Sequence, residues 1–218
     1  MDNSIYVALS KQVATERQLD MLAHNLANAS TTGYKSGSML FSEYLLKDAN
    51  GKTSYAMDYG TGRNNAQGAL ESTGNPLDLA ISGKGYFAVQ TPQGERYTRA
   101  GNFTINQNGE LSTMDGYQVL DNSGQPITFQ PDDEKISVFS NGKLEVDGDE
   151  RATVGVYEFA NENNLKYVSG NLFSSDENAV VIEDPKVTQG MLEQSNVQPI
   201  LEITKLINTQ RNFVSASK

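Results

Sequence analysis

A glycine-rich stretch, GKGYFA at residues 83–88, has the spacing of a dinucleotide-binding fingerprint, G-x-G-x-x-G/A. That fingerprint binds a pyrophosphate only where a helix begins directly after the glycines and presents its N-terminus to the phosphates. Here residues 86–94, YFAVQTPQG, predict a strand followed by a turn. We therefore expect the glycines to form a tight turn between strands, and we expect no cofactor.

Two further stretches have some features of calcium sites. Asn106, Asn108 and Gly109 are spaced like part of a calcium loop, and residues 145–150 read EVDGDE. The first stretch lacks the carboxylates and the bidentate glutamate that an EF-hand requires. Both stretches are typical of solvated hairpin turns, and we predict no metal site.

The residue types that do most catalytic chemistry are scarce or badly spaced. The single histidine, His24, has no carboxylate beside it in sequence, and there is no cysteine. No serine lies in a G-x-S-x-G elbow. Asp132 and Asp133 are adjacent, so in a strand their side chains would point to opposite faces. These patterns predict that the protein is not an enzyme.

Composition limits the partners. The 218 residues are enough for one large domain or two small ones, and the formal net charge is −10. Binding to a phosphate backbone needs clustered Lys and Arg, so nucleic acid is excluded as a partner. No apolar run reaches the roughly 18 residues of a membrane span. The N-terminus lacks the basic and apolar regions of a signal peptide, which predicts a cytoplasmic protein or export without a cleaved signal.

Both ends of the chain have helical periodicity. Residues 4–28 carry an apolar stripe with no Gly or Pro, and the repeat is near 3.5 residues, which favours a coiled-coil or bundle contact. This helix should end by residues 29–30, before Gly33. Residues 195–218 predict a second helix, capped by Ser195 or Asn196, with Pro199 in its first turn.

The middle of the chain has other signals. Residues 34–74 lack a sustained period and predict an extended linker or arm. Residues 75–194 contain short strand-like runs separated by Asn-Gly and similar turns, which predicts an antiparallel sheet or small barrel. The expected fold class is therefore α+β, with a terminal helical domain at residues 1–33 and 195–218 bracketing a β-rich middle.

Four blocks, in order along the chain, resemble a known family. HNLANASTTGYK (residues 24–35) is similar to the signature that closes the N-terminal helix of bacterial flagellar rod and hook proteins. The same family is resembled by NPLDLAISGKGYFAV (75–89), YTRAGNFTINQNGELSTMDGYQVL (97–120) and LEQSNVQPILEITKLINTQRNF (192–213). The opening MDNSIYVALS and the modest length favour a proximal-rod subunit over a distal-rod subunit or the hook protein.

The resemblance implies a structural subunit of the flagellar basal body. Its terminal helices would pair as an inner coiled-coil layer lining a tube, with the β-rich middle outside. The implied partners are other rod subunits, further copies of the chain, the surrounding rings and the flagellar type III export apparatus. The implied location is the periplasmic rod. Chains of this family usually continue beyond the QRNF block, whereas this sequence ends at VSASK, either as a short natural variant or with residues missing.

The residues expected to act fall into two groups. The apolar stripes of the two helices should make the assembly contacts: Ile5, Leu9, Val13, Leu19, Leu22, Leu26, Val197, Ile200, Ile203, Leu206, Ile207 and Phe213. A second group should shape the helix end and the exit of the chain into the linker: Asn25, Asn28, Thr32, Gly33, Tyr34 and Lys35.

Other uses of the helices stay open at this point. The apolar stripes could pack as ordinary core against the chain's own β-rich domain. The chain could also be a secreted β-domain that binds a surface ligand and is oligomerised by its helices. An enzyme whose site no sequence pattern reveals is the least favoured alternative.

Overall fold

The computed structural model describes residues 3–48, 51–133 and 135–216, with side chains described for residues 9–40, 60–133 and 135–214. The described chain forms two compact units. Unit 1 contains helix α1 (Asn3–Ala27), strands β1 (Gly37–Asp48) and β2 (Gly51–Arg63), and helix α2 (Pro199–Ala216). Unit 2 contains Thr31–Tyr34 and Ala66–Asn196. None of the described helices is long and apolar enough to cross a membrane.

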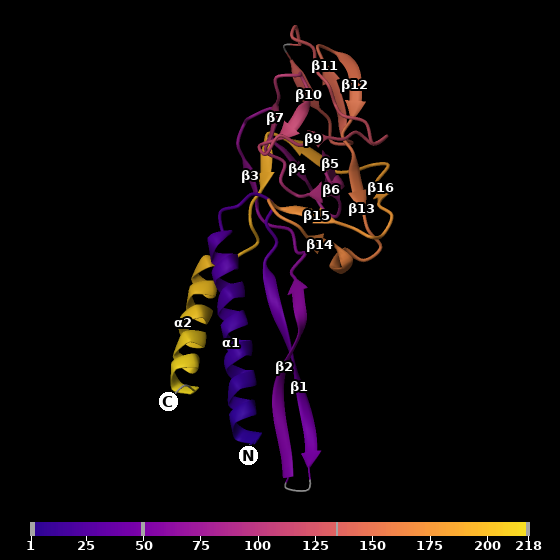
Figure 1. Cartoon of the computed structure of the whole chain (residues 1–218). Coiled ribbons are helices and arrows are strands. Elements are labelled where there is room, and N and C mark those ends of the chain that lie inside the picture. The colour runs from indigo at the N-terminus through magenta and orange to yellow at the C-terminus, as the bar shows by residue number, and fades with distance from the viewer. Residues whose placement is uncertain (1–2, 49–50, 134, 217–218) are drawn as a thin grey trace. The chain divides into compact units, whose positions relative to one another are not determined.

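In unit 1 the two helices pack side by side and run antiparallel (Figure 1). Helix α1 has 25 residues, and its hydrogen bonding ends where the amide of Asn28 donates to the carbonyl of His24. Helix α2 begins at Pro199, where a missing N–H costs little because the first helical amides have no partner within the helix. The predicted helices are present.

The cap expected for α2 is wrong. The first described amide bond of α2 runs from Glu202 to the carbonyl of Gln198, so the helix begins later than a cap at Ser195 or Asn196 would require. The side chain of Asn196 donates instead to the carbonyl of Ala66, 2.8 Å away, within unit 2. The side-chain amide of Asn196 therefore binds a loop and does not cap the helix.

Within the stretch expected to be an extended linker or arm, residues 37–63 form an antiparallel hairpin. Its register runs from Gly37 opposite Arg63 to Asp48 opposite Gly51, with a bulge after Leu40. A backbone ladder needs no alternation of apolar residues, so these strands leave no sustained period in the sequence. The hairpin packs on α1 within unit 1, where a side chain at Gly37 would lie 2.5 Å from the Sδ atom of Met21.

Unit 2 is built from antiparallel strands, which confirms the predicted β-rich middle. One large sheet has the order β14-β15-β6-β5-β9-β8-β7, with β13 and β16 attached through β5. Its strands are β5 (Tyr86–Thr91), β6 (Gly94–Thr98), β7 (Phe103–Ile105), β8 (Leu111–Thr113), β9 (Gln118–Val119), β13 (Val156–Glu158), β14 (Lys166–Tyr167), β15 (Leu172–Ser174) and β16 (Val180–Val181).

Smaller sheets complete unit 2. Strands β10 (Ile136–Val138), β11 (Lys143–Val146) and β12 (Asp149–Thr153) form a meander, and a 3-10 turn spans Glu162–Asn164. Strand β3 (Leu70–Ser72) pairs with β18 (Met191–Glu193), and β4 (Leu79–Ile81) pairs with β17 (Val187–Gln189). The first and last strands of unit 2 therefore pair with each other, and these pairings join the two ends of the unit.

Strand β5 explains where the core lies. Phe87 and Val89 face one buried cluster, whereas Tyr86 and Ala88 face a second cluster. Successive side chains of a strand point to opposite faces, so both faces of β5 are covered. Gly83 and Gly85 have positive φ angles of 103° and 117° and precede a strand, so they form the expected turn and no helix follows them.

The turn at Asn106 is a hairpin connection between β7 and β8. The Oδ1 atom of Asn106 accepts hydrogen bonds from the amides of Asn108 and Glu110, and Gly109 has a φ of 79°. Side-chain hydrogen bonds from Asn106 and Gln118 lower the pKa of the Glu110 carboxyl below its usual value. The amide-rich sequence thus closes a turn. Among the described residues, no group of three or more His, Asp or Glu side chains is placed to hold a metal ion.

Candidate functional site

The apolar side chains of α2 separate into two stripes on different sides of the helix, one partly buried and one exposed. Leu206 and Phe213 are partly buried and alternate with the buried polar residues Glu202 and Thr209, at intervals of four, three and four residues. A second stripe faces outward and is exposed, with intervals of three, four and seven residues: Ile200, Ile203, Ile207 and Val214. Sequence periodicity had placed these residues on one broad face.

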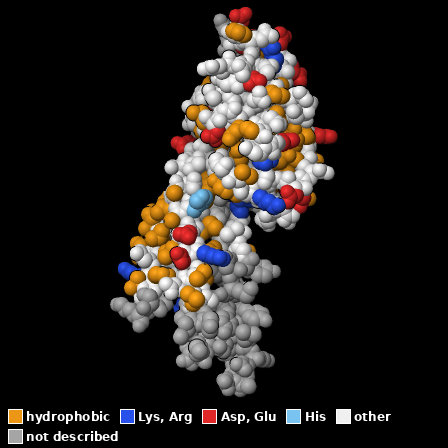
Figure 2. All heavy atoms as spheres, in the orientation of Figure 1, with side chains coloured by type: hydrophobic (Ala, Val, Ile, Leu, Met, Phe, Trp, Pro, Cys, Tyr) orange, Lys and Arg blue, Asp and Glu red, His pale blue; other side chains and the backbone are white. Residues whose placement is uncertain are grey.

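The outward stripe of α2 leaves large aliphatic side chains in water. Ile200 is 79% exposed, and Leu201 beside it is 52% exposed. Figure 2 shows hydrophobic side chains gathered over α2. Burying a side chain of this size is worth about 1.5–3 kcal/mol. A contiguous exposed apolar surface of this kind marks an interaction site.

Helix α1 is divided in the same way. Leu22 is buried, and Ala14 is buried on the same side of the helix. Leu9 and Val13 are exposed at 54% and 41%, on the opposite side. Leu19 and Leu26 are partly buried, and the side chain of Ile5 lies outside the described residues. The predicted stripe of α1 therefore also presents part of its apolar surface outward.

The contact between the helices includes a buried polar group near the C-terminal end of α1 and the N-terminal end of α2. The Nδ2 atom of Asn25 donates to Glu202 at 3.0 Å and to the carbonyl of Gly37 at 2.8 Å. The amide of Gly37 donates back to Oδ1 of Asn25 at 2.9 Å. Glu202 also pairs with Lys205 at 2.7 Å. Asn25, 2% exposed, thus joins α1, α2 and β1. A satisfied buried polar group fixes one register between helices.

The predicted helix-end motif divides between the two units. Asn28 donates from its side chain to the carbonyl of His24, which closes α1 in unit 1. Lys35 is buried in unit 1, and Val197 is buried in the same unit. Thr32, Gly33 and Tyr34 belong to unit 2 and lead away from the helix.

Three contacts hold Thr32, Gly33 and Tyr34 in unit 2. The carbonyl of Thr32 accepts a hydrogen bond from the side chain of Asn171 at 2.8 Å. The amide of Gly33 donates to the carbonyl of Glu193 at 2.7 Å. The carbonyl of Tyr34 accepts from the amide of Asn196 at 3.3 Å. This short segment is thus held by residues far along the sequence.

Gly33 satisfies two separate constraints. Its φ is 70°, a left-handed conformation that residues with a Cβ rarely adopt. A Cβ atom there would lie 2.5 Å from the backbone nitrogen of Ala100 and from the carbonyl carbon of Arg99. The backbone of the motif therefore packs directly on the backbone that follows β6.

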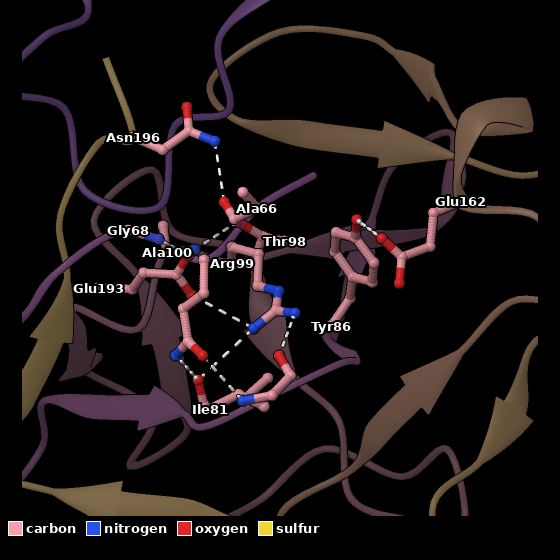
Figure 3. Close-up of polar contacts among 12 residues, drawn as sticks. Ala66, Gly68, Ile81, Tyr86, Thr98, Arg99, Ala100, Glu162, Glu193 and Asn196 are labelled. Atoms are coloured by element: carbon pink, nitrogen blue, oxygen red, sulfur yellow. Dashed lines mark hydrogen bonds and ion pairs between the residues drawn. The ribbon is translucent and has the colours of Figure 1, made fainter. Parts of the chain in front are cut away.

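A buried ion pair lies beside this segment (Figure 3). Arg99 and Glu193 are 3% and 1% exposed, and Nη1 of Arg99 lies 3.2 Å from Oε2 of Glu193. Sequence reasoning missed the pair because its residues are far apart in the chain. The available signal was that each residue lies inside a block that resembles the flagellar family, in YTRAGNF and LEQSNVQ.

Comparison with known proteins matches three parts of the chain. Residues 5–35 match the family described as flagella basal body rod protein, and residues 188–218 match the flagellar basal body rod FlgEFG protein C-terminal family. Residues 80–146 match the flagellar hook protein FlgE/F/G D1 domain. The matched parts include the helix-end motif, α2 and most of the central strands.

Full-length relatives agree with these matches. The chain is 39% identical over 225 residues to the flagellar basal-body rod protein FlgF of Caulobacter vibrioides, which covers 100% of this chain and 92% of the relative. It is 38% identical over 216 residues to FlgF of Mesorhizobium japonicum, covering 98% and 90%. It is 33% identical over 248 residues to the rod protein FlgG of Bacillus subtilis, covering 100% and 94%.

Proposed function

The chain belongs to the FlgE/F/G family of flagellar basal-body rod proteins, and from this premise we propose that it is a subunit of the proximal rod. It is a structural rod subunit of the basal body that assembles with other rod subunits, and it is not an enzyme. The proximal position is supported by identities of 39%, 38% and 36% to three FlgF proteins, compared with 33% to each of three FlgG proteins; a fourth FlgF protein is 31% identical.

The assembly mechanism that we propose uses the outward stripes of α1 and α2. The inward sides of the helices carry apolar residues such as Leu22 together with the buried polar residues Asn25 and Glu202, whereas Leu9, Val13 and the outward stripe of α2 stay exposed. Neighbouring subunits would bury these stripes in a coiled-coil layer around the export channel. Because the inward and outward faces differ, the contacts between copies are heterologous and can propagate as a helical tube.

The exposed stripe of α2 is the single observation that carries this proposal. A helix that served only as core for its own chain would not leave Ile200, Ile203 and Ile207 in water. The alternative of a secreted binding protein is not favoured by the comparisons. We further propose that the subunit reaches the periplasm through the flagellar type III apparatus without a cleaved signal, and that the surrounding rings are neighbours of the rod.

One substitution tests the outward stripe. Ile203→Asp places a charge in the proposed contact between subunits, where an unpaired carboxylate is costly to bury. In the native bacterium, in place of the wild-type gene, this variant should be exported but should leave the rod incomplete, with loss of swimming. Export is measured by immunoblot, and rod completion by electron microscopy of purified basal bodies.

Asn208→Asp is the matched control. Asn208 is exposed on α2 but lies away from the outward stripe, and the change adds the same charge without changing the size of the side chain. The control should assemble normally. Normal rods and swimming with Ile203→Asp, or equal loss with both variants, would contradict the proposed contact surface.

A further inference from the structure

The chain passes between its two units at four places. The residues of unit 2 at these crossings are hydrogen-bonded to one another. The crossings follow Ser30, Tyr34, Asn65 and Asn196. The residues on the unit 2 side are Thr31–Tyr34, the start of Ala66–Asn196, and the end of the same range. We call Thr31–Tyr34, residues 66–68 and residues 193–196 the junction segments.

Direct hydrogen bonds join the junction segments to one another. The amide of Gly33 donates to the carbonyl of Glu193, and the amide of Asn196 donates to the carbonyl of Tyr34. The side chain of Asn196 donates to the carbonyl of Ala66 (Figure 3). The last segment lies 125 residues or more beyond the other two, yet it is hydrogen-bonded to both of them.

The carboxylate of Glu193 makes two further contacts. Its Oε1 accepts from the amide of Gly68 at 3.0 Å, and its Oε2 pairs with Arg99 at 3.2 Å. A Cβ atom at Gly68 would lie 1.9 Å from the carbonyl oxygen of Gln194, so these two backbones touch. One carboxylate thus connects residues 66–68 to the strand that precedes the last crossing.

Arg99 is fixed on its other side by the body of unit 2. Its Nη2 donates to the carbonyl of Gly83 at 2.6 Å, and its guanidinium lies 5.2 Å from the centre of the Tyr86 ring. The Nε atom has no hydrogen-bond partner among the described residues. Arg99 is therefore held in place by unit 2, and its ion pair in turn fixes the position of the Glu193 side chain.

We propose that the Arg99–Glu193 pair is a positioning element, which holds the junction segments at one place on unit 2. Replacing a buried ion pair by apolar residues is often neutral for stability, so the reason to keep the charges is the geometry that they enforce. The hydrogen bonds that join the junction segments, and the Arg99–Glu193 pair, all lie within unit 2.

The test measures amide hydrogen exchange by NMR on the purified full-length chain. The double variant Arg99→Met with Glu193→Leu removes both buried charges together, so no unpaired charge remains. The amide of Gly68 loses its carboxylate acceptor and should exchange roughly tenfold to a hundredfold faster, the range expected for losing a hydrogen bond to a charged group. The amide of Gly33 keeps its acceptor, the backbone carbonyl of Glu193, so faster exchange there reports displacement of the junction segments. The amides of Leu111 and Leu120, which bond within the sheet, should stay within about threefold of the wild type.

The matched control removes an exposed pair of the same kind. Lys143→Met with Glu150→Leu replaces an ion pair whose side chains are 42% and 52% exposed, in the same unit. Exchange at Gly33 and Gly68 should be unchanged in this control. The single change Glu193→Gln serves if the double variant does not fold. It keeps an oxygen for Gly68 but leaves the buried Arg99 charge without its partner, so exchange at Gly33 should rise more than exchange at Leu111 and Leu120.

Two results would overturn the proposal. Unchanged exchange at Gly33 and Gly68 would mean that the pair positions nothing. An equal increase at all four amides would mean that the pair acts only on the stability of unit 2. Neither result depends on whether the chain builds a rod, so a failure here is separate from a failure of the proposed function.

Discussion

At the scale of single residues, Gly33 is the position of the helix-end motif at which a side chain is least tolerated. It combines a φ of 70° with backbone contact to Arg99 and Ala100. The sequence allowed the first property to be expected, because Gly after a helix commonly takes a left-handed conformation. The contact was not predictable, because it depends on a strand more than sixty residues later.

A matched pair of substitutions separates the two properties of Gly33. Gly116 has a φ of 86°, and a Cβ atom there would meet nothing within 4 Å. Gly116→Ala should therefore cost only the left-handed conformation, about 1–2 kcal/mol. Gly33→Ala adds a backbone clash and should cost about 1–3 kcal/mol more in the free energy of unfolding, measured by urea denaturation. Equal losses would contradict the close approach at Gly33.

Asn25 acts at the same scale but joins three elements. Removing its amide in Asn25→Ala leaves Glu202 and the amide of Gly37 without these bonds in a buried place. An unsatisfied buried polar group costs about 1–3 kcal/mol. We expect faster hydrogen exchange at the amide of Gly37, which NMR can follow residue by residue.

The control for Asn25 is Asn28→Ala, which removes an exposed side-chain bond to the carbonyl of His24. That change should leave exchange at Gly37 within about twofold of the wild type, because an exposed group regains water as its partner. Protection of Gly37 that survives in Asn25→Ala would show that Asn25 does not hold β1 to the helix.

At the scale of elements, the terminal helices were predictable and the hairpin was not. A helical repeat of apolar residues over about seven turns, without Gly or Pro, is a strong signal, and the structure has α1 (Asn3–Ala27) at this place. Residues 37–63 carry no such pattern, because a two-stranded ladder is held by backbone groups.

The sequence also could not predict whether a helical stripe faces its own chain or the outside. Periodicity identifies apolar positions but cannot say whether the partner is the same chain or another copy. The structure shows the stripe of α2 divided between a side with Leu206 and Phe213 and a side with Ile200 and Ile207. Glu202, a charged residue on the inward side, would not be selected by any rule that seeks apolar contacts.

At the scale of the whole molecule, the order of the strands explains why distant residues matter. Strand β3 pairs with β18 and β4 pairs with β17, so unit 2 joins its first segment to its last. Short strand-like runs and their turns predicted an antiparallel domain, but strand order between distant runs has no local signal. The Arg99–Glu193 pair was missed for the same reason, since its residues meet only after this closure.

The central claim is that the chain is a structural subunit of the proximal rod. The most direct measurement is to insert a short epitope tag between Ser123 and Gly124, in an exposed turn of unit 2, and to purify basal bodies from the native bacterium. Gold-labelled antibody and electron microscopy then locate the tag. We predict label on the rod, at its proximal part. Label confined to the hook, or basal bodies without label from a strain that still swims, would contradict the account.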